Sequence, residues 1–271
     1  MKKILLFSAL TALFAGCSQD KGPKVLVLYY SQTATTKVVA EEISQRLGAD
    51  IEEIVPVESY GTDFQGAIAR SSRERESGIL PEIQPLAADV SSYDIIFIGY
   101  PIWFGTYALP IGTLLENVDF SGKKVVPFCT FGSGGLDTSI NDLKQKLTGA
   151  EVLPGYGVRQ ARIDAVPAEI DRFLKQGGFL QGEVEPYEEF GEMHPVSEEE
   201  SAIFDAAVGT YPMIQAKAES VSSRPVPGGT EYIFEARDVP RGPVPAGVTP
   251  PIKVYVLDME GQDPIFTQVL R

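Results

Sequence analysis

The 271-residue sequence is poor in residues that bind metals or crosslink chains. It contains one histidine, His194, and two cysteines, Cys17 and Cys129. This inventory excludes a histidine-rich zinc site, a cysteine-cluster metal site and a disulfide scaffold, and it leaves little for a histidine-based triad. Basic residues are also scarce, since 23 Lys and Arg face 37 Asp and Glu, a formal charge of -14. Without a basic stripe the chain would be repelled by phosphate backbones, so we expect no nucleic-acid partner.

The rest of the composition is that of a folded protein. Hydrophobic residues make up 44% and charged residues 22% of the chain, which is enough apolar material for a sizeable core. At roughly 150 residues per domain, the length predicts nearly two domains. The chemistry left to such a chain is that of backbone amides, hydroxyls and aromatic rings.

Residues 1–17 have the features of an export signal. A basic start precedes an apolar run from Ile4 to Phe14, and this run is shorter than the roughly 20 apolar residues of a membrane-spanning helix. It ends in Leu-Phe-Ala-Gly-Cys17, which resembles a bacterial lipobox and implies that Cys17 carries a lipid. The alternative is a plain secreted protein in which Cys17 is an incidental thiol. We expect a lipid-anchored protein of the cell envelope, on the periplasmic side or at the outer membrane, with residues 18–23 as a tether.

Between residues 24 and 180, short apolar runs alternate with longer amphipathic stretches. Strands are expected at 25–30, 51–57, 95–100, 124–129 and near 152–153, and helices at 35–47 and 167–175. This alternation predicts an α/β domain, a five-stranded parallel sheet with helices on both faces. In such sheets ligands bind beyond the carboxyl ends of the strands.

The first strand is followed by a loop rich in hydroxyls, Ser31-Gln32-Thr33-Ala34-Thr35-Thr36-Lys37, which leads into a helix. The free N–H groups and the dipole of a helix N-terminus suit a phosphate, and neighbouring hydroxyls supply further donors. A Ser or Thr N-cap is the simpler interpretation. Because one capping residue would satisfy that need and the loop offers four hydroxyls, the pattern favours phosphate binding.

Two further loops follow the third and fourth strands. The first, Pro101-Ile102-Trp103-Phe104-Gly105, contains the only tryptophan, on which a planar aromatic ligand would stack. The alternative is that Trp103 is a core residue at a helix start. The second, Thr130-Phe131-Gly132-Ser133-Gly134-Gly135, is a glycine-rich turn. Three such loops at successive strand ends predict one composite pocket.

These three loops, in this order, resemble the motifs of the flavodoxin family. The resemblance covers roughly residues 24–175 and implies FMN as the cofactor. The residues that it assigns to FMN are Ser31, Gln32, Thr33, Ala34, Thr35, Thr36, Pro101, Ile102, Trp103, Phe104, Gly105, Phe131, Gly132 and Gly134. The first loop would hold the phosphate, the second would line the isoalloxazine with Trp103 stacked on it, and the third would close its other side.

Three positions depart from the family pattern. Ala34 replaces the usual Gly, Thr35 replaces Asn and Phe104 replaces a second Trp. A left-handed backbone angle at Ala34 would cost roughly 1 kcal/mol. The charged residues Arg70 to Glu76 fit a solvated helix face better than a lid beside the flavin, and Cys129 fits a core position better than a redox thiol.

Residues 181–195 are acidic and carry Gly and Pro, so we expect a linker before a second domain at 196–271. A helix capped by Ser197 precedes strands expected at 214–221, 231–236, 252–257 and 265–270. This small α+β antiparallel domain resembles the cystatin fold, and Gly229, Thr230 and Tyr232 match its first hairpin. Proline replaces two inhibitory residues of that hairpin and the second hairpin lacks a Pro-Trp pair, so the fold is implied but not protease inhibition. Residues 240–251 are expected to form a long hairpin loop.

The sequence therefore predicts an exported, lipid-anchored, flavodoxin-like protein that binds FMN for electron transfer or for reduction of a small acceptor such as a quinone. The residues do not decide between an electron carrier with an unknown redox partner and an FMN-dependent oxidoreductase. The alternative is a non-catalytic envelope protein, in which the first domain is a scaffold and the cystatin-like module binds a partner.

Overall fold

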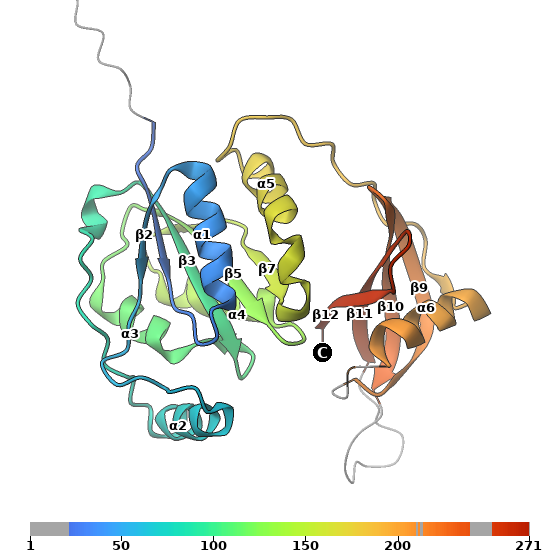
Figure 1. Cartoon of the computed structure of the whole chain (residues 1–271), viewed down its shortest axis with the longest axis horizontal. Helices are drawn as coiled ribbons and strands as arrows, with labels where there is room; N and C mark the ends of the chain where they lie inside the picture. The colour runs from blue at the N-terminus through green and yellow to red at the C-terminus, as the bar shows by residue number, and fades with distance from the viewer. Residues whose placement is uncertain (1–21, 210, 212–213, 239–250, 271) are drawn as a thin grey trace, which may run out of the picture.

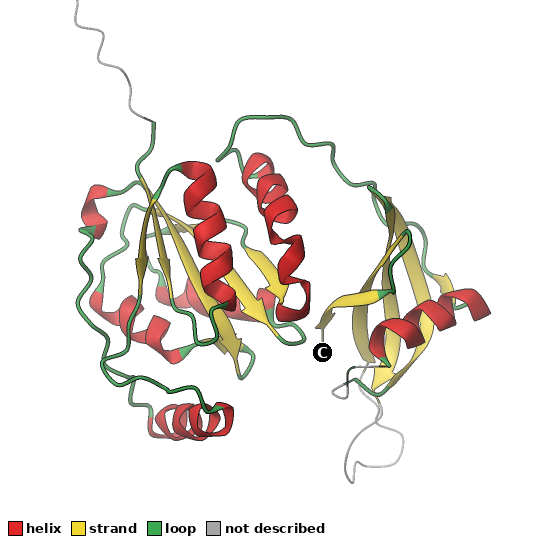
Figure 2. Ribbon diagram, viewed as in Figure 1, coloured by secondary structure: helices red, strands yellow, loops and turns green. Residues whose placement is uncertain are grey.

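The computed structural model describes residues 22–209, 211, 214–238 and 251–270. They form a parallel sheet with helices on both faces and a separate antiparallel sheet with one helix, joined by an extended segment (Figure 1; Figure 2). This confirms the predicted fold class. The leader with Cys17 and the expected loop at 240–251 lie outside the described residues, apart from Pro251 at the start of a strand. No helix in the described part of the chain is both long and apolar enough to cross a membrane.

The first sheet has the strand order β2-β1-β3-β5-β6, all parallel. Its strands are β1 (Val25–Tyr29), β2 (Asp50–Glu53), β3 (Ile95–Trp103), β5 (Lys124–Phe131), β6 (Glu151–Val152) and β7 (Tyr156–Arg159), with β4 (Thr106–Tyr107) antiparallel to the end of β3. The predicted fifth strand is split, because β6 and β7 both pair with β5 and the Pro154-Gly155 step separates them. The strand order reverses between β1 and β3, so their carboxyl ends flank the crevice where such sheets bind ligands.

Two hydrophobic layers hold the helices against this sheet. On one face, Val27 and Phe97 pack against α1 (Thr35–Leu47) and α5 (Val166–Gln176). On the other face, Leu28 and Ile98 pack against α3 (Leu109–Asn117) and α4 (Leu136–Lys146), and α2 (Phe64–Ser77) joins the same layer through Ala67. These strands are apolar on both sides because both of their faces are covered.

The second sheet has the order β12-β11-β10-β9-β8 and is antiparallel throughout. Its elements are β8 (His194–Pro195), α6 (Glu198–Val208), β9 (Ala216–Val226), β10 (Gly229–Asp238), β11 (Pro251–Met259) and β12 (Ile265–Leu270). Ser197 and Glu200 form a capping box at the start of α6, and Phe204 of that helix packs against Phe234. The end of the expected linker belongs to this domain, because β8 pairs with β9.

Candidate functional site: three loops at the carboxyl ends of the strands

The loop between β1 and α1 is held in a strained conformation. Ala34 precedes the first residue of α1 with φ 62° and ψ -5°, in the left-handed region, and its side chain provides no cap. A left-handed angle costs an alanine roughly 1 kcal/mol. Neither Thr35 nor Thr36 has a protein acceptor for its backbone N–H among the described residues, while the N–H of Lys37 donates to Ser31 Oγ at 3.2 Å. The strained backbone at Ala34 thus leaves the first N–H groups of the helix available for an anion.

The four hydroxyls of this loop have different roles. Thr33 and Thr35 lie 3.3 Å apart between their hydroxyl oxygens, at an exposed and a half-buried position. The Thr36 side chain is buried, and its hydroxyl lies 2.8 Å from that of Thr130 at the end of β5. All four hydroxyls are predicted to hold a phosphate, but in this structure the Ser31 hydroxyl accepts from the Lys37 N–H and the Thr36 hydroxyl joins two loops. Thr33 and Thr35, with the free N–H groups, remain as donors.

Gln32 connects the same loop to its neighbours. Its side-chain oxygen accepts a hydrogen bond from Tyr30 Oη at 2.5 Å, and its amide nitrogen donates to the carbonyl of Gly61 at 2.6 Å. The loop after β1 is thereby fixed to the segment that follows β2. Gln32 therefore orients the loop rather than presenting its amide to a ligand.

The second loop is the tip of a β-hairpin. Trp103 pairs with Thr106, and the two residues between them, Phe104 at φ 52° and Gly105 at φ 83°, both have left-handed backbones. Two successive left-handed residues are the signature of a tight two-residue hairpin turn, in which the second position favours glycine. The Phe104 ring is 51% exposed, with the Arg75 guanidinium 5.6 Å from its centroid. The turn places Trp103, as the last residue of β3, at the crevice.

Trp103 is half-buried and held by two tyrosines. The Tyr30 ring meets it edge-on at 5.6 Å between centroids, and the Tyr60 ring does so at 5.0 Å. Such edge-to-face contacts fix the orientation of an indole ring. Tyr60 was not among the residues predicted for the site, although it follows the second parallel strand and so reaches the same edge of the sheet.

Arg70 and Glu74 of α2 contact Tyr60 and hold its ring in place. Its hydroxyl donates to Glu74 at 2.5 Å, Arg70 Nε donates to the same carboxylate at 2.7 Å, and the Arg70 guanidinium lies 4.2 Å from the Tyr60 ring centroid. Burial, followed by the hydrogen bond to Glu74, raises the pKa of Tyr60, and burial raises that of Tyr30. The sequence predicts a solvated helix face for residues 70–76. In the structure Arg70 and Glu74 form an ion pair with each other and are part of the support for Trp103.

The third loop departs most from expectation. The Phe131 ring is 6% exposed and packs in the core, next to Leu136, so it does not offer a face to a ligand. A Cβ on Gly134 would collide with the carbonyl oxygen of Val269 in β12, so this glycine faces the second domain. Gly135, one residue on, touches the second loop instead, because a Cβ there would lie 3.2 Å from Ile102 Cγ2 and 3.5 Å from the Gly105 carbonyl oxygen.

The three loops therefore meet at one edge of the sheet. The Thr36–Thr130 hydroxyl contact joins the first to the third, and Gly135 joins the third to the second. The assembly contains backbone N–H groups and two hydroxyls from the first loop and an oriented indole from the second. Such a donor set suits a ligand with an anionic end and a planar ring.

Comparison with known proteins places this arrangement in a family. The model of the flavodoxin family matches residues 24–166, which is more than half of the 271 residues. The chain belongs to the flavodoxin family. No curated protein matches the chain.

Solved structures resemble the flavodoxin domain. A protein from Bacteroides uniformis ATCC 8492 described as a flavoprotein is 32% identical, with a TM-score of 0.50, and the match covers 56% of this chain and 99% of that one. A similar protein from Bacteroides eggerthii DSM 20697 is 31% identical, with a TM-score of 0.47, over 55% of this chain and 98% of that one. A flavoprotein of Lactobacillus acidophilus NCFM, solved in complex with FMN, is 27% identical, with a TM-score of 0.47, over 55% and 97% of the two chains.

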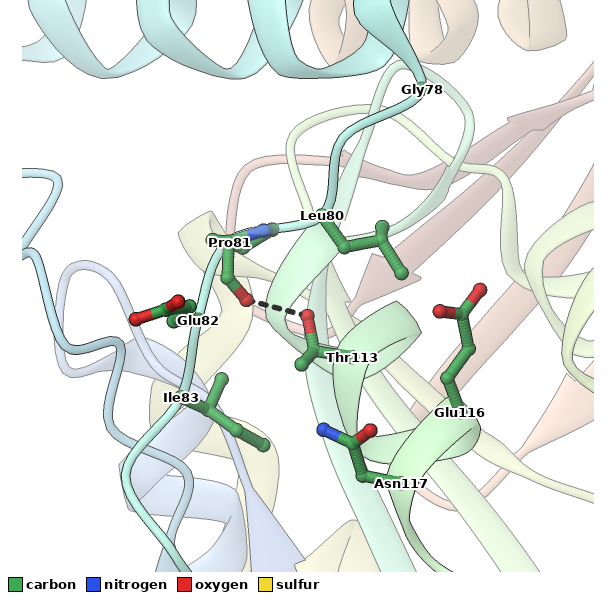
Figure 3. A pocket seen from close by; sticks show the side chains of 8 residues that line it. All are labelled: Gly78, Leu80, Pro81, Glu82, Ile83, Thr113, Glu116 and Asn117. Atoms are coloured by element: carbon green, nitrogen blue, oxygen red, sulfur yellow. Dashed lines mark hydrogen bonds between the residues drawn. The ribbon is translucent and has the colours of Figure 1, made fainter.

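Two pockets of the flavodoxin domain lie elsewhere, beside α3. The first, of about 370 Å³, is lined by Leu80, Ile83, Thr113 and Asn117 with Glu82 and Glu116, and the Thr113 hydroxyl donates to the Pro81 carbonyl at 2.6 Å (Figure 3). The second, of about 560 Å³, continues from Ile83 to Asp119. Carboxylates at both pockets disfavour a phosphate, so neither matches the ligand chemistry of the three loops. Among the described residues no cluster of His, Cys, Asp and Glu suits a metal ion.

Proposed function

We propose that this chain binds FMN where the three loops meet and uses it for electron transfer or for reduction of a small acceptor such as a quinone. Membership of the flavodoxin family supports FMN as the cofactor. The observation that carries the proposal is the left-handed Ala34 next to the free N–H groups of Thr35 and Thr36. This conformation leaves two neighbouring N–H groups at the start of α1, where one phosphate can accept from both.

The first loop would hold the phosphate. The N–H groups of Thr35 and Thr36 and the hydroxyls of Thr33 and Thr35 are the donors, and the positive end of the α1 dipole adds to their attraction. Ser31 keeps these donors in place, because its hydroxyl oxygen accepts a hydrogen bond from the Lys37 N–H in the first turn of α1. Hydrogen bonds to a charged group are each worth about 1.5–3 kcal/mol, so the phosphate would supply much of the affinity.

The second loop would orient the ring. Trp103 offers an indole whose tilt is fixed by Tyr30 and Tyr60, and the Gly105 turn lets main chain come close to a ligand. When bound, FMN supplies the redox chemistry of the site. The residues of the three loops bind it, orient it and shield it from water.

A titration of FMN with the full chain tests the proposal. We expect flavin fluorescence to be quenched with a dissociation constant below about 1 µM, a free energy of about 8 kcal/mol. Trp103→Ala should weaken binding about tenfold or more, and the matched Trp103→Phe variant, which keeps a flat ring, should lose much less. A chain that leaves FMN fluorescence unchanged at micromolar concentrations would refute the proposal and favour the non-catalytic binding protein.

The second step is to separate a carrier from a reductase. With FMN loaded, we expect slow oxidation of NAD(P)H in the presence of quinones, because the sequence has no nicotinamide-binding fingerprint. Fast multiple turnover would identify an oxidoreductase instead of an electron carrier.

Export and lipid anchoring extend the proposal. The basic, apolar start and the lipobox-like segment ending at Cys17 support a lipid anchor at the cell envelope. Fatty-acid labelling of cells that express the full chain should mark the protein, and Cys17→Ser should abolish the label. A label that persists in Cys17→Ser would place the anchor elsewhere.

The second domain would serve as a cystatin-like module that binds a partner without inhibiting proteases. Its one helix and antiparallel sheet support this, and so does Gly228, whose φ of 80° forms the tip between β9 and β10. Papain activity should be unchanged by a molar excess of the chain. Tight inhibition would show that the proline-containing hairpin is functional.

A further inference from the structure

The last strand of the second domain uses its free edge to bind the flavodoxin domain. β12 is an edge strand of its sheet, so one side of its backbone is not paired within that sheet. On that side the Val269 N–H donates to the Ser133 carbonyl at 2.7 Å. The Phe266 carbonyl accepts from Arg159 Nη1 at 2.5 Å. Two backbone groups of the edge strand, one donor and one acceptor, are thus satisfied by the other domain.

Arg159 joins the second domain to the third loop. This last residue of β7 is only 6% exposed, and its Nε donates to the Gly132 carbonyl at 2.9 Å while its Nη1 reaches Phe266. The guanidinium lies 3.4 Å from the centroid of the Phe266 ring and 5.3 Å from that of Tyr211, two aromatic residues of the second domain. Burial lowers its pKa to about 10, so it remains charged at neutral pH. A buried cation with main-chain acceptors in both segments fixes their relative position.

The third loop, which accepts these hydrogen bonds from Arg159 and Val269, is one of the three loops that the flavodoxin motifs assign to the flavin. Its Gly132 and Ser133 carbonyls are both used, by Arg159 and by Val269. In a trans peptide the C=O and the next N–H point in opposite directions. The N–H groups of Ser133 and Gly134 are therefore turned away from these two partners, and no acceptor within the described residues takes them up. Gly135 then continues into contact with Ile102 and Gly105 of the second loop.

The match to the Bacteroides uniformis flavoprotein covers 99% of that chain with only 56% of this one, so the second domain is an addition to a complete flavodoxin domain. The addition is held at two places. Besides β12, Tyr187 of the connecting segment lies between the guanidiniums of Arg172 on α5, at 3.6 Å from its centroid, and Arg224 on β9, at 5.0 Å. These contacts attach the connecting segment to both domains, which a freely mobile tether would not require.

We propose that the second domain is a structural part of the flavin site: β12 and Arg159 hold loop 132–135 in its ligand-binding form, so domain docking and FMN binding stabilise each other. This rests on the proposed function, because it takes FMN as the ligand. By thermodynamic reciprocity, FMN tightens the docking of β12 by the same factor by which docking tightens FMN binding. Arg159 is a positioning residue that acts through the loop.

Val269→Pro, a substitution in the second domain, tests the coupling between domain docking and FMN binding. Proline is tolerated on the outward side of an edge strand, so this change removes the N–H donated to Ser133 and leaves the pairing with β11 in place. Val269→Ala is the matched control, because it also shortens the side chain but keeps the N–H. We expect the dissociation constant of FMN to rise about tenfold in Val269→Pro and less than about twofold in Val269→Ala. Equal affinities in the two variants would overturn the proposal.

Arg159→Met gives a second test that does not depend on Val269→Pro folding. In this variant the dissociation constant should again rise about tenfold, whereas Arg162→Met, which removes an ion pair with Glu169 inside the first domain, should change it less than about twofold. Amide exchange read by NMR supplies a measurement independent of redox activity. FMN should slow exchange of the Val269 amide in the wild-type chain, and this slowing should be lost in Arg159→Met.

The outcomes separate the two proposals. Failure of the wild-type chain to bind FMN would refute the proposed function and the coupling with it. Normal FMN binding by Arg159→Met, or a Val269 amide whose exchange is unaffected by FMN in the wild type, would refute the coupling alone.

Discussion

The Thr36 hydroxyl lies 2.8 Å from the Thr130 hydroxyl, and both side chains are buried. This contact joins the first turn of α1 to the end of β5, two segments 94 residues apart in the sequence. The buried hydroxyl of Thr36 differs from that of its neighbour Thr35, whose side chain is only half-buried. The structural role of the Thr36 hydroxyl thus differs from the ligand-binding role that we propose for Thr35.

Substitution of these threonines by valine should separate the two roles. Thr36→Val leaves the Thr130 hydroxyl buried without its partner, and we expect the free energy of unfolding to fall by about 1–2 kcal/mol. Thr35→Val should leave stability within about 0.5 kcal/mol and weaken FMN binding several-fold, because it removes a phosphate donor. Urea denaturation and FMN titration of both variants measure this. The reverse pattern would show that the assignment of roles is wrong.

Ala34→Gly should stabilise the protein. The alanine has φ 62°, which is strained for a residue with a Cβ, and its relief outweighs the extra chain entropy of glycine by roughly 0.5 kcal/mol. The matched variant Ala40→Gly, in the buried interior of α1, should instead lower stability by about 1 kcal/mol. Chemical denaturation measures both, and destabilisation by Ala34→Gly would contradict the strain at this position.

The buried tyrosines should make the fold sensitive to alkali. Burial, with Glu53 nearby, raises the pKa of Tyr29 to about 12, and burial raises those of Tyr30 and Tyr60 further. Since the folded state holds these protons more tightly than the unfolded state, whose tyrosines titrate near 10, the stabilisation is complete below pH 10 and is lost as the pH rises from about 10 to 12. The part of the phenolate absorbance at 295 nm that comes from these three rings should therefore appear together with loss of circular dichroism. Complete ionisation near pH 10.5 with an intact dichroism spectrum would contradict the burial of these rings.

Cys129 should be chemically inert in the native protein. Its side chain is fully buried in β5, and burial raises the pKa of its thiol. In a Cys17→Ser chain, which leaves Cys129 as the only thiol, Ellman's reagent at pH 8 should react only after denaturant is added. Rapid reaction of the native protein would show that Cys129 is accessible and would revive a redox role.

Local pattern was sufficient for most of the fold. The helix predicted at 35–47 begins and ends at the same residues as α1, because its apolar spacing and the Gly48 that follows it are local signals. The doubly covered strands were equally clear as apolar runs. The short strands β4 and β8 were not predicted, since each has two residues and forms only through its partner. The strand predicted at 51–57 ends at Glu53, and the helices α3 and α4 had no predicted bounds.

The sequence predicts that the three loops lie at one edge of the sheet, but it does not identify the residues that support them. Loops 31–36 and 101–105 follow their strands, so their location was a consequence of topology. Tyr60 and the buried pairing of Thr36 depend on contacts between distant segments, which periodicity does not report. Arg159 left one readable signal, a charged residue directly after the apolar strand residues Tyr156 to Val158, but its partners in β12 could be known only from the structure.

The most direct test of the three-loop site is a calorimetric comparison of FMN with riboflavin, which has the same ring without the phosphate. Because the first loop provides charge-assisted donors for the phosphate, we expect the full chain to bind FMN about a hundredfold more tightly than riboflavin, and Thr35→Val to narrow that ratio. Equal affinity for the two flavins would contradict a phosphate site at Ala34 to Thr36, and binding of neither would contradict the flavin site as a whole.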